Sequence, residues 1–265
     1  MIPIVLSIAG SDSGGGAGIQ ADIKTIQANG GYAATVVTAV TAQNSVAVTD
    51  SIDIPVSLIE AQIDAVCTDM QVAAIKTGML SSVEIVESIA AKLKSYDIHP
   101  LVVDPVMVSK SGFALLKEDA VEAVVRRLFP LADLVTPNAE EASILVGGDV
   151  KTIADAKDAA VTIHAMGPQA VLVKGGHLDS GSEAVDILYD GDSFVVYRKD
   201  RIDTTNTHGT GCTYASAICT NMAFGIGLEE SVRLAKEYVT DAIKAALPIG
   251  QGHGPLDHFF RQRKG

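Results

Sequence analysis

Cysteine is scarce in this sequence, and its spacing excludes two common structural uses. The three cysteines, Cys67, Cys212 and Cys219, are odd in number and form no CxxC pair. They therefore indicate neither a disulfide framework nor a zinc site. Long apolar runs are also missing, because no stretch approaches the roughly 20 residues of a membrane-spanning helix. The first residues lack the basic segment and the longer apolar run of a secretory signal peptide. We therefore expect a cytoplasmic protein without a membrane partner.

Basic residues are few compared with acidic ones. The chain has 20 lysine and arginine residues against 32 aspartate and glutamate residues, which gives a formal net charge of −12. Nonspecific nucleic-acid binding depends on clustered cations that neutralise phosphates, so we expect no nucleic-acid partner. A small polyanion can still bind such a protein where cations are placed locally or where a divalent metal bridges the charges.

Apolar residues are plentiful, at 48% of the 265 residues, and the mean hydropathy is +0.28. A chain of this length and composition can bury a large core. The sequence contains no linker rich in proline and serine, no low-complexity segment and no internal repeat. We therefore expect residues 1–265 to form a single domain.

Short apolar segments alternate with longer amphipathic segments along most of the chain. Near-continuous apolar strands separated by helices predict an α/β fold with a parallel sheet that is covered on both faces. The predicted strands are 2–10, 33–40, 72–78, 101–107, 132–138 and 170–176, and the predicted helices between and after them are 17–29, 57–68, 82–95, 118–129, 139–146 and 152–166. A hairpin is predicted over 183–198, and two more helices over 210–224 and 229–246.

Polar or glycine residues follow most of the predicted strands. In open α/β sheets the ligand lies beyond the carboxyl ends of the parallel strands, so we expect these residues to meet at one edge of the sheet. They are Gly10-Ser11-Asp12, Lys76-Thr77-Gly78-Met79, Asp104-Pro105, Asn138 and Lys174-Gly175-Gly176.

The glycine-rich segment "AGSDSGGGAGIQAD" (9–22) follows the first strand and opens a helix. It is not a P-loop, because the Gly-Lys-Ser/Thr ending is missing, and it does not match the dinucleotide-binding pattern either. Three consecutive glycines exceed what a turn requires and favour close approach of the backbone to a ligand. Gln43, in "TAQNS", carries an amide donor and acceptor that suit the edge of a heteroaromatic ring, although taken alone it is better explained as an amide of a surface loop.

Three further segments each allow a structural and a functional interpretation. Asp104, directly after a buried strand, is a candidate ligand for Mg²⁺ or an acid that caps the next loop. Asn138 and Glu141 resemble a capping box at a helix start, or two side chains that face a metal and phosphates. Lys174, before two glycines, is a candidate phosphate ligand or a surface lysine.

The segment "NTHGTGCTYASA" (206–217) places Cys212 in the first turn of a predicted helix after a glycine-punctuated turn. Such a helix start binds anions, and it lowers the pKa of a thiol by stabilising the thiolate. Residue types alone leave three roles open for this cysteine: inert packing, a covalent nucleophile with His208 as partner, or a base beside a bound phosphate.

Eight segments, taken in chain order, resemble the bacterial hydroxymethylpyrimidine and phosphomethylpyrimidine kinases of thiamin biosynthesis, in the ribokinase-like superfamily. They are "IAGSDSGGGAGIQADIKT", "TAQN", "IKTGML", "VVDPVMV", "TPNAEEA", "KGGH", "NTHGTGCT" and "GHGPLDHF", from about residue 2 to residue 260. The resemblance implies a ribokinase-like three-layer α/β/α sandwich with a mostly parallel central sheet and a small β flap. It also implies a kinase that uses ATP and Mg²⁺ to phosphorylate 4-amino-5-hydroxymethyl-2-methylpyrimidine to the monophosphate and then to the diphosphate.

The resemblance also assigns expected roles to residues that match the family's motifs. Gln43 matches the residue that hydrogen-bonds the aminopyrimidine, and Gly10, Asp22, Met79 and Val106 match the pyrimidine pocket. The positions that contact the nucleotide in the family are matched by Asn138, Glu141, Lys174 and Thr207. The family's metal ligands are matched by Asp104 and Glu141. Gly209, Thr210 and Gly211 match the anion hole, with Cys212 as the proposed base and Lys174 as a catalytic cation.

The cysteine itself narrows the family. Sugar kinases with this fold usually carry aspartate where Cys212 stands, so the cysteine points to the pyrimidine kinases and to the similar pyridoxal kinases. The family members known to us as pyridoxal kinases lack the TAQN glutamine, so Gln43 favours the pyrimidine over pyridoxal. A thiol-dependent transferase and a non-catalytic pyrimidine sensor are the remaining alternatives. The resemblance further implies a homodimer, and residues 107–115, with Gly112 as a hinge, and 44–54 are expected to be mobile covers of the site.

Overall fold

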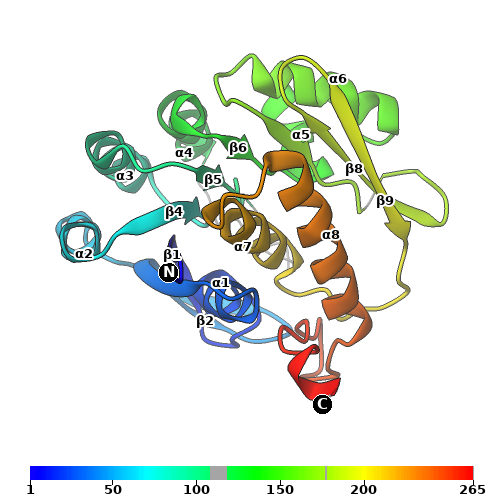
Figure 1. Cartoon of the computed structure of the whole chain (residues 1–265), viewed down its shortest axis with the longest axis horizontal. Coiled ribbons are helices and arrows are strands. Elements are labelled where there is room, and N and C mark those ends of the chain that lie inside the picture. Colours follow the sequence, from blue (N-terminus) through cyan, green and yellow to red (C-terminus); the bar gives the residue numbers. More distant parts are fainter. Residues whose placement is uncertain (108–117, 177, 265) are drawn as a thin grey trace.

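A mostly parallel sheet forms the centre of the protein. The structure, a computed structural model of the whole chain, describes residues 1–107, 118–176 and 178–264. In this described part, nine strands form one sheet in the order β3-β2-β1-β4-β5-β6-β7-β8-β9 (Figure 1). The strands are β1 Ile4–Asp12, β2 Tyr32–Gln43, β3 Val48–Asp53, β4 Val72–Thr77, β5 Leu101–Val103, β6 Leu134–Val135, β7 Val171–Val173, β8 Glu183–Tyr189 and β9 Phe194–Asp200. The strands from β2 to β7 in this order run parallel, whereas β3, β8 and β9 pair antiparallel with their neighbours.

Helices cover both faces of this sheet, as Figure 1 shows. On one face lie α1 (Gly18–Ala28), α7 (Thr210–Ala223) and α8 (Leu228–Lys244), and on the other lie α2 (Val56–Asp69), α3 (Val83–Tyr96), α4 (Glu118–Ala123), α5 (Ala139–Val146) and α6 (Ile153–His164). Successive residues of β1 point to opposite faces, so Val5 packs in one core and Leu6 in the other. This alternation explains why the central strands are apolar throughout, and it confirms the predicted three-layer arrangement.

Helix α7 lies deepest of the three helices on its face. It contacts α1, α8 and the sheet, and every residue from Thr213 to Asn221 is buried. Small side chains such as Ala215, Ser216 and Ala217 allow these neighbours to approach closely. Cys219 is fully buried here, so its role is packing. Among the described helices, none is long and apolar enough to cross a membrane.

Several predicted boundaries differ from the structure. The single helix predicted over 118–129 is α4 followed by a π-helical turn (Val124–Leu128) and a 3-10 turn (Phe129–Leu131). Pro130 contributes to the break, because proline has no N–H to donate to a carbonyl of the preceding helical turn. The strands predicted over 101–107 and 132–138 end early, at Val103 and Val135, because Pro105 and Pro137 cannot donate to a sheet ladder.

The predicted hairpin is present as β8 and β9, and it extends the main sheet through β7. Part of the segment predicted as a mobile cover over 44–54 is instead strand β3, which is paired with the end of β2. These two strands represent the predicted β flap and remain part of the sheet. Of the other predicted cover, 107–115, only Met107 lies within the described residues, and Gly112 lies outside them.

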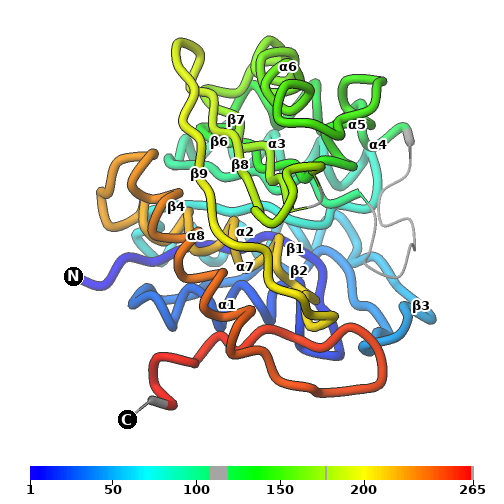
Figure 2. The backbone as a smooth tube through the Cα atoms, turned by 90° about the vertical axis from the view of Figure 1, so that its right-hand side faces the viewer, coloured from blue at the N-terminus to red at the C-terminus, as the bar shows by residue number. Residues whose placement is uncertain are grey.

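The C-terminal segment returns to the carboxyl edge of the sheet. Figure 2 shows it, in red, below α1 and α8. The N–H of His208 donates to the carbonyl of Gly254, and the N–H of His253 donates to the carbonyl of Ser45. The segment thereby joins the end of β2 to the turn that precedes α7.

Candidate active site

One cavity of about 390 Å³ opens at the carboxyl edge of the parallel strands. The predicted convergence of strand ends is therefore present. Of the residues that the sequence assigned to a site, twelve line this cavity: Gly10, Gln43, Met79, Asp104, Val106, Asn138, Glu141, Lys174, Gly209, Thr210, Gly211 and Cys212. Asp22 and Thr207 do not line it. The carbonyl of Thr207 instead accepts hydrogen bonds from the N–H and the hydroxyl of Thr210.

The turn before α7 can adopt its shape only with glycine at position 209. Gly209 has a φ of 80°, and a Cβ there would lie 1.8 Å from the carbonyl oxygen of Gly16. The turn thus lies directly against the glycine-rich loop that follows β1. The first N–H groups of a helix have no acceptor within the helix. In α7 the N–H of Thr210 donates to the Thr207 carbonyl, and the next two residues, Gly211 and Cys212, line the cavity. This end of α7 is therefore suited to bind an anion.

Cys212 is a half-buried thiol in the first turn of α7, where it lines the cavity. Burial raises its pKa to about 11, although Lys76 and a hydrogen bond from the Gly18 backbone act in the opposite direction. For this thiol, burial outweighs the stabilisation of the thiolate that a helix start provides. His208 does not form the alternative nucleophile pair with Cys212. Within the described residues, its ring nitrogen Nε2 instead lies within hydrogen-bond distance of Asp12 and Gln43.

A buried ion pair lies beneath Cys212. The ammonium of Lys76, from β4, is 3.0 Å from both carboxylate oxygens of Asp22, from α1. Ser216, one turn after Cys212, donates to Asp22 over 2.7 Å, and Ser7 donates to it over 2.6 Å. Asp22 is thus enclosed by partners, and it is Lys76 that lines the cavity. The sequence signal for Lys76 was a lysine inside the apolar run "VAAIKTG".

Lys174, which follows β7, is paired with Asp104 after β5 and interacts electrostatically with Glu141 in the first turn of α5. Its ammonium is 2.7 Å from Oδ1 of Asp104, which also accepts a 3.0 Å hydrogen bond from Thr136. Although burial opposes it, Lys174 and Lys76 hold the pKa of Asp104 below its usual value. Burial, opposed by Lys174 and reinforced by Asp104, raises the pKa of Glu141 to about 7. The three side chains form a coupled set of charges on one wall of the cavity.

Asn138 and Glu141 form the predicted capping box at the start of α5. The Asn138 side chain accepts from the Glu141 N–H at 2.9 Å, and the Glu141 carboxylate accepts from the Asn138 N–H at 2.7 Å. Both residues also line the cavity, so the capping role is compatible with a place in the site. Among the described residues, no three acidic, histidine or cysteine side chains form a metal cluster. The two carboxylates of Asp104 and Glu141 instead suit Mg²⁺ that is shared with phosphate oxygens and water.

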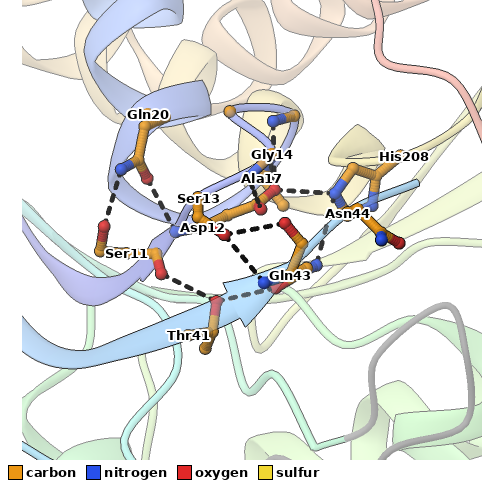
Figure 3. A network of polar contacts seen from close by, with 12 residues as sticks. Ser11, Asp12, Ser13, Gly14, Ala17, Gln20, Thr41, Gln43, Asn44 and His208 are labelled. Carbon is orange, nitrogen blue, oxygen red and sulfur yellow. Dashed lines mark hydrogen bonds and ion pairs between the residues drawn. The ribbon is translucent and has the colours of Figure 1, made fainter. Parts of the chain in front are cut away.

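Opposite this wall, Asp12 joins the glycine-rich loop to the turn before α7 (Figure 3). Its carboxylate accepts hydrogen bonds from the N–H groups of Gly14, Gly16 and Ala17, and its Oδ2 lies 2.8 Å from Nε2 of His208. Although burial opposes them, these bonds hold the pKa of Asp12 below its usual value. Asp12 was predicted only as a strand-end residue, and its pairing with His208 links positions too distant in sequence to be inferred from spacing.

Gln43 lies beside this pair, as Figure 3 shows. Its side-chain nitrogen is 3.4 Å from Nε2 of His208, and its side-chain oxygen is 3.1 Å from the hydroxyl of Thr41. The single Nε2–H of His208 donates to ionised Asp12, and the one hydroxyl hydrogen of Thr41 is shared between the Ser11 carbonyl and the Gln43 side-chain oxygen. The Gln43 amide therefore lines the cavity close to Thr41 and His208.

Several known kinases are similar to this chain. The phosphomethylpyrimidine kinase family matches residues 12–257. A hydroxymethylpyrimidine/phosphomethylpyrimidine kinase of Streptomyces coelicolor is 51% identical over 97% of this chain and 94% of its own length. The thiamine biosynthesis bifunctional protein ThiED of Geobacter sulfurreducens is 50% identical over 97% of this chain, which spans 52% of that longer protein.

Solved structures show the same fold. An ADP complex of Bacillus subtilis pyridoxal kinase has a TM-score of 0.92 at 40% identity and covers 99% of both chains. A phosphomethylpyrimidine kinase from Clostridium difficile has a TM-score of 0.81 at 46% identity, over 91% of this chain and 99% of that one. The ribokinase-like fold predicted from the sequence is confirmed by this likeness. The match over most of the chain, together with relatives about half identical to it, shows that this chain belongs to the phosphomethylpyrimidine kinase family.

Proposed function

We propose that this protein transfers the γ-phosphoryl group of ATP to 4-amino-5-hydroxymethyl-2-methylpyrimidine, and then phosphorylates the monophosphate to the diphosphate, in thiamin biosynthesis. The observation that carries the proposal is the cavity itself. It brings the start of α7, Lys174 and Cys212 together with the amide of Gln43. An anion site, a cation and a proton acceptor thus share one space with a group suited to an aminopyrimidine edge.

Phosphoryl transfer depends mainly on positioning and on stabilisation of charge. In the proposed reaction, the N–H groups at the start of α7 bind the transferring phosphoryl group. Lys174 neutralises a phosphate oxygen, and Asn138 and Thr207 belong to the nucleotide side of the site. Asp104 and Glu141 would hold Mg²⁺, which when bound neutralises charge on the triphosphate. The pyrimidine side comprises Gly10, Gln43, Met79 and Val106, with Asp22 acting from behind through Lys76.

Cys212 is the proposed base for the first reaction only. The hydroxymethyl group must lose a proton as it attacks, whereas the phosphate of the second substrate is already ionised near neutral pH. A thiol with a pKa near 11 is a weak acid, and its conjugate thiolate is correspondingly a strong base. Lys76 and the Gly18 backbone stabilise the thiolate once it forms.

The second candidate substrate is pyridoxal, because the B. subtilis pyridoxal kinase has the same fold over nearly the full chain. The relatives about half identical to this chain are named for the pyrimidine, which favours the pyrimidine as main substrate. A thiol transferase is disfavoured by the raised pKa of Cys212 and by the engagement of His208 with Asp12. A sensor without turnover is disfavoured because Asp104, Glu141, Lys174 and Cys212 all meet at the cavity.

An ATP-consumption assay with the three acceptors tests the proposal. We expect turnover with the hydroxymethylpyrimidine and with its monophosphate, and slower turnover with pyridoxal. Faster phosphorylation of pyridoxal than of the pyrimidine would make the second candidate the main activity. Binding of the pyrimidine without ATP consumption would contradict a kinase function altogether.

We also propose that the protein is a cytoplasmic homodimer, since ATP is abundant in the cytoplasm and one apolar pair is exposed where β2 meets the edge strand β3. Val40 of β2 and Ile52 of β3 are opposite each other in the ladder, and they are 43% and 69% exposed. An exposed apolar pair on an edge strand favours pairing with a second copy. Sedimentation velocity tests this: Ile52→Asp should shift a dimer towards monomer, and a monomeric wild-type protein would contradict it.

A further inference from the structure

The turn that follows Lys174 is held by two hydrogen bonds from consecutive backbone N–H groups. The N–H of Lys174 donates to the carbonyl of Pro137 over 2.8 Å. The next N–H, that of Gly175, donates to Oδ1 of Asp186 over 2.9 Å. The first acceptor belongs to the neighbouring strand end, but the second belongs to a side chain on β8. The position of the Lys174 backbone therefore depends on a carboxylate outside the cavity.

Gly175 lies so close to β8 that no other residue can replace it. A Cβ at this position would be 1.9 Å from the carbonyl oxygen of Val185. This approach brings the Gly175 N–H within reach of the Asp186 side chain. The glycine and the carboxylate thus work as a matched pair that holds the turn against the sheet.

Asp186 is buried, and its second oxygen is paired with a buried lysine. Oδ2 lies 2.6 Å from the ammonium of Lys236, on α8, and the two side chains are only 3% and 8% exposed. A buried ion pair is weak evidence of stabilisation, because apolar residues of similar volume are often as stable. What an apolar residue cannot supply is an acceptor for the Gly175 N–H.

The same carboxylate is coupled to the helix that carries Cys212. Tyr214, two residues later on α7, is buried at 3% exposure. Burial and the nearby Asp186 carboxylate hold the pKa of Tyr214 well above its usual value, and the Tyr214 hydroxyl has no hydrogen-bond partner among the described residues. Lys236 belongs to α8, which packs along α7. Asp186 therefore lies between the turn that presents Lys174 and the helix whose start forms the anion site.

From this geometry we infer that Asp186, charge-balanced by Lys236, is a positioning residue that holds Lys174 in register with the start of α7 for both phosphorylations. The inference rests on the proposed function. Asp186 does not line the cavity, so it acts through Gly175 and Lys174 rather than on a substrate. The buried lysine is present to balance the charge of the acceptor.

A matched pair of double variants separates this role from a contribution to stability. Asp186→Asn/Lys236→Met removes both charges but keeps a side-chain oxygen for the Gly175 N–H. Asp186→Leu/Lys236→Met removes the charges and the acceptor together. An unpaired buried N–H has a desolvation cost that corresponds to a change of about tenfold or more in an equilibrium constant. We therefore expect the turn that holds Lys174 to leave its position when the acceptor is lost. We expect the Asn/Met variant to stay within about threefold of wild type, and the Leu/Met variant to lose at least about tenfold in kcat/KM for ATP in both reactions.

The effect of Lys174→Met, compared between the wild-type and the Leu/Met backgrounds, separates a positioning role of Asp186 from a purely structural one. Lys174→Met should cost much less in the Leu/Met background than in the wild-type background, because residues that act as one unit are not additive. Thermal denaturation checks that both double variants are folded. If the Leu/Met variant does not fold, Asp186→Ser/Lys236→Met, whose hydroxyl is too short to reach Gly175, is measured with the same expectations.

Affinity for ADP, measured by titration calorimetry, keeps this inference apart from the choice of acceptor substrate. It should weaken about tenfold in the Leu/Met variant and stay near wild type in the Asn/Met variant. Equal kinetics and equal ADP affinity for the two folded double variants, or full additivity with Lys174→Met, would overturn the inference. If wild-type protein does not phosphorylate the pyrimidine, the proposed function fails, but the ADP measurements still decide the role of Asp186.

Discussion

The ammonium of Lys174 lies 2.7 Å from Oδ1 of Asp104, so the proposed phosphate cation and the proposed metal ligand are paired with each other. Asp104 is 1% exposed, and its other neighbours include Thr136 and Lys76. In the free protein each charge thus compensates the other. A nucleotide phosphate and its metal would compete for these two side chains in the same place.

This pairing predicts that Lys174→Met affects both stability and catalysis. Removal of one partner leaves a buried charge uncompensated, which costs about 3 kcal/mol or more of unfolding free energy. Loss of the cation should also lower kcat by about 100-fold in both phosphorylations. The double variant Asp104→Asn/Lys174→Met should regain stability without regaining activity. Urea denaturation and steady-state kinetics check the two effects, and recovery of both in the double variant would contradict the assigned roles.

Cys212→Ala is expected to separate the two phosphorylations. A general base contributes about 100-fold to 10,000-fold, so the first reaction should slow by that range. The second reaction should change much less, because its nucleophile is already ionised. With a thiol pKa near 11, the thiolate fraction rises with pH throughout the neutral range. Where chemistry is rate-limiting, the first reaction of wild type should therefore speed up with pH. Equal losses in both reactions, measured separately, would show that Cys212 is not the base.

Gly209→Ala tests the geometry of the anion site. The new Cβ would lie 1.8 Å from the Gly16 carbonyl in a backbone conformation that disfavours side chains, so the turn must shift. Displacement of oxyanion donors typically costs about 100-fold to 1,000-fold in kcat, and here both reactions should suffer. Gly148→Ala is the matched control, because a Cβ there meets nothing within 4 Å. Comparable kinetics for the two variants would exclude an anion site at this turn.

Much of the fold could be predicted because its cause is local. Apolar runs such as "LVVDPVM" indicate the central strands, and the strand-end rule alone predicts that Gly10, Asp104 and Lys174 meet at one edge, where they do line one cavity. The strand β3 could not be predicted because "VTDSID" is polar at an exposed edge and has no apolar pattern. The end of α4 at Ala123 could not be predicted, because the helical period continues through the residues that form the π-helical and 3-10 turns.

Side-chain partners in the site were harder to predict, because they depend on distant pairs. Asp12 with His208 and Lys76 with Asp22 join elements far apart in the chain, and spacing contains no information on such contacts. The pKa of Cys212 could not be predicted, because the helix start can be read from sequence whereas the depth of burial cannot. The family resemblance supplied the roles of Gln43 and Cys212, which residue types alone had left open.

His258 predicts a dependence of stability on pH. This histidine is 3% exposed and lies 3.0 Å from the hydroxyl of Thr213, the residue after Cys212. Burial, followed by repulsion from Lys24, lowers its pKa to about 4. An unfolded histidine titrates near about 6.5, so between these values the unfolded state binds more protons. The contribution of neutral His258 is therefore complete above the unfolded pKa and is lost as the pH falls towards the folded one. From about pH 7 to about pH 5 this should remove roughly 2 kcal/mol from the unfolding free energy.

His258→Gln should flatten that part of the pH profile, since glutamine offers Thr213 a partner but does not titrate. His99 is the control of opposite sign. It is half-exposed, and its hydrogen bond with Asp133 raises its pKa. Its contribution is therefore present below the unfolded pKa and is lost as the pH rises through the folded one, so His99→Gln should steepen the same profile. Urea denaturation at several pH values between about 5 and about 8 measures all three proteins. Parallel profiles for wild type and His258→Gln would mean that His258 is not held neutral in the folded state.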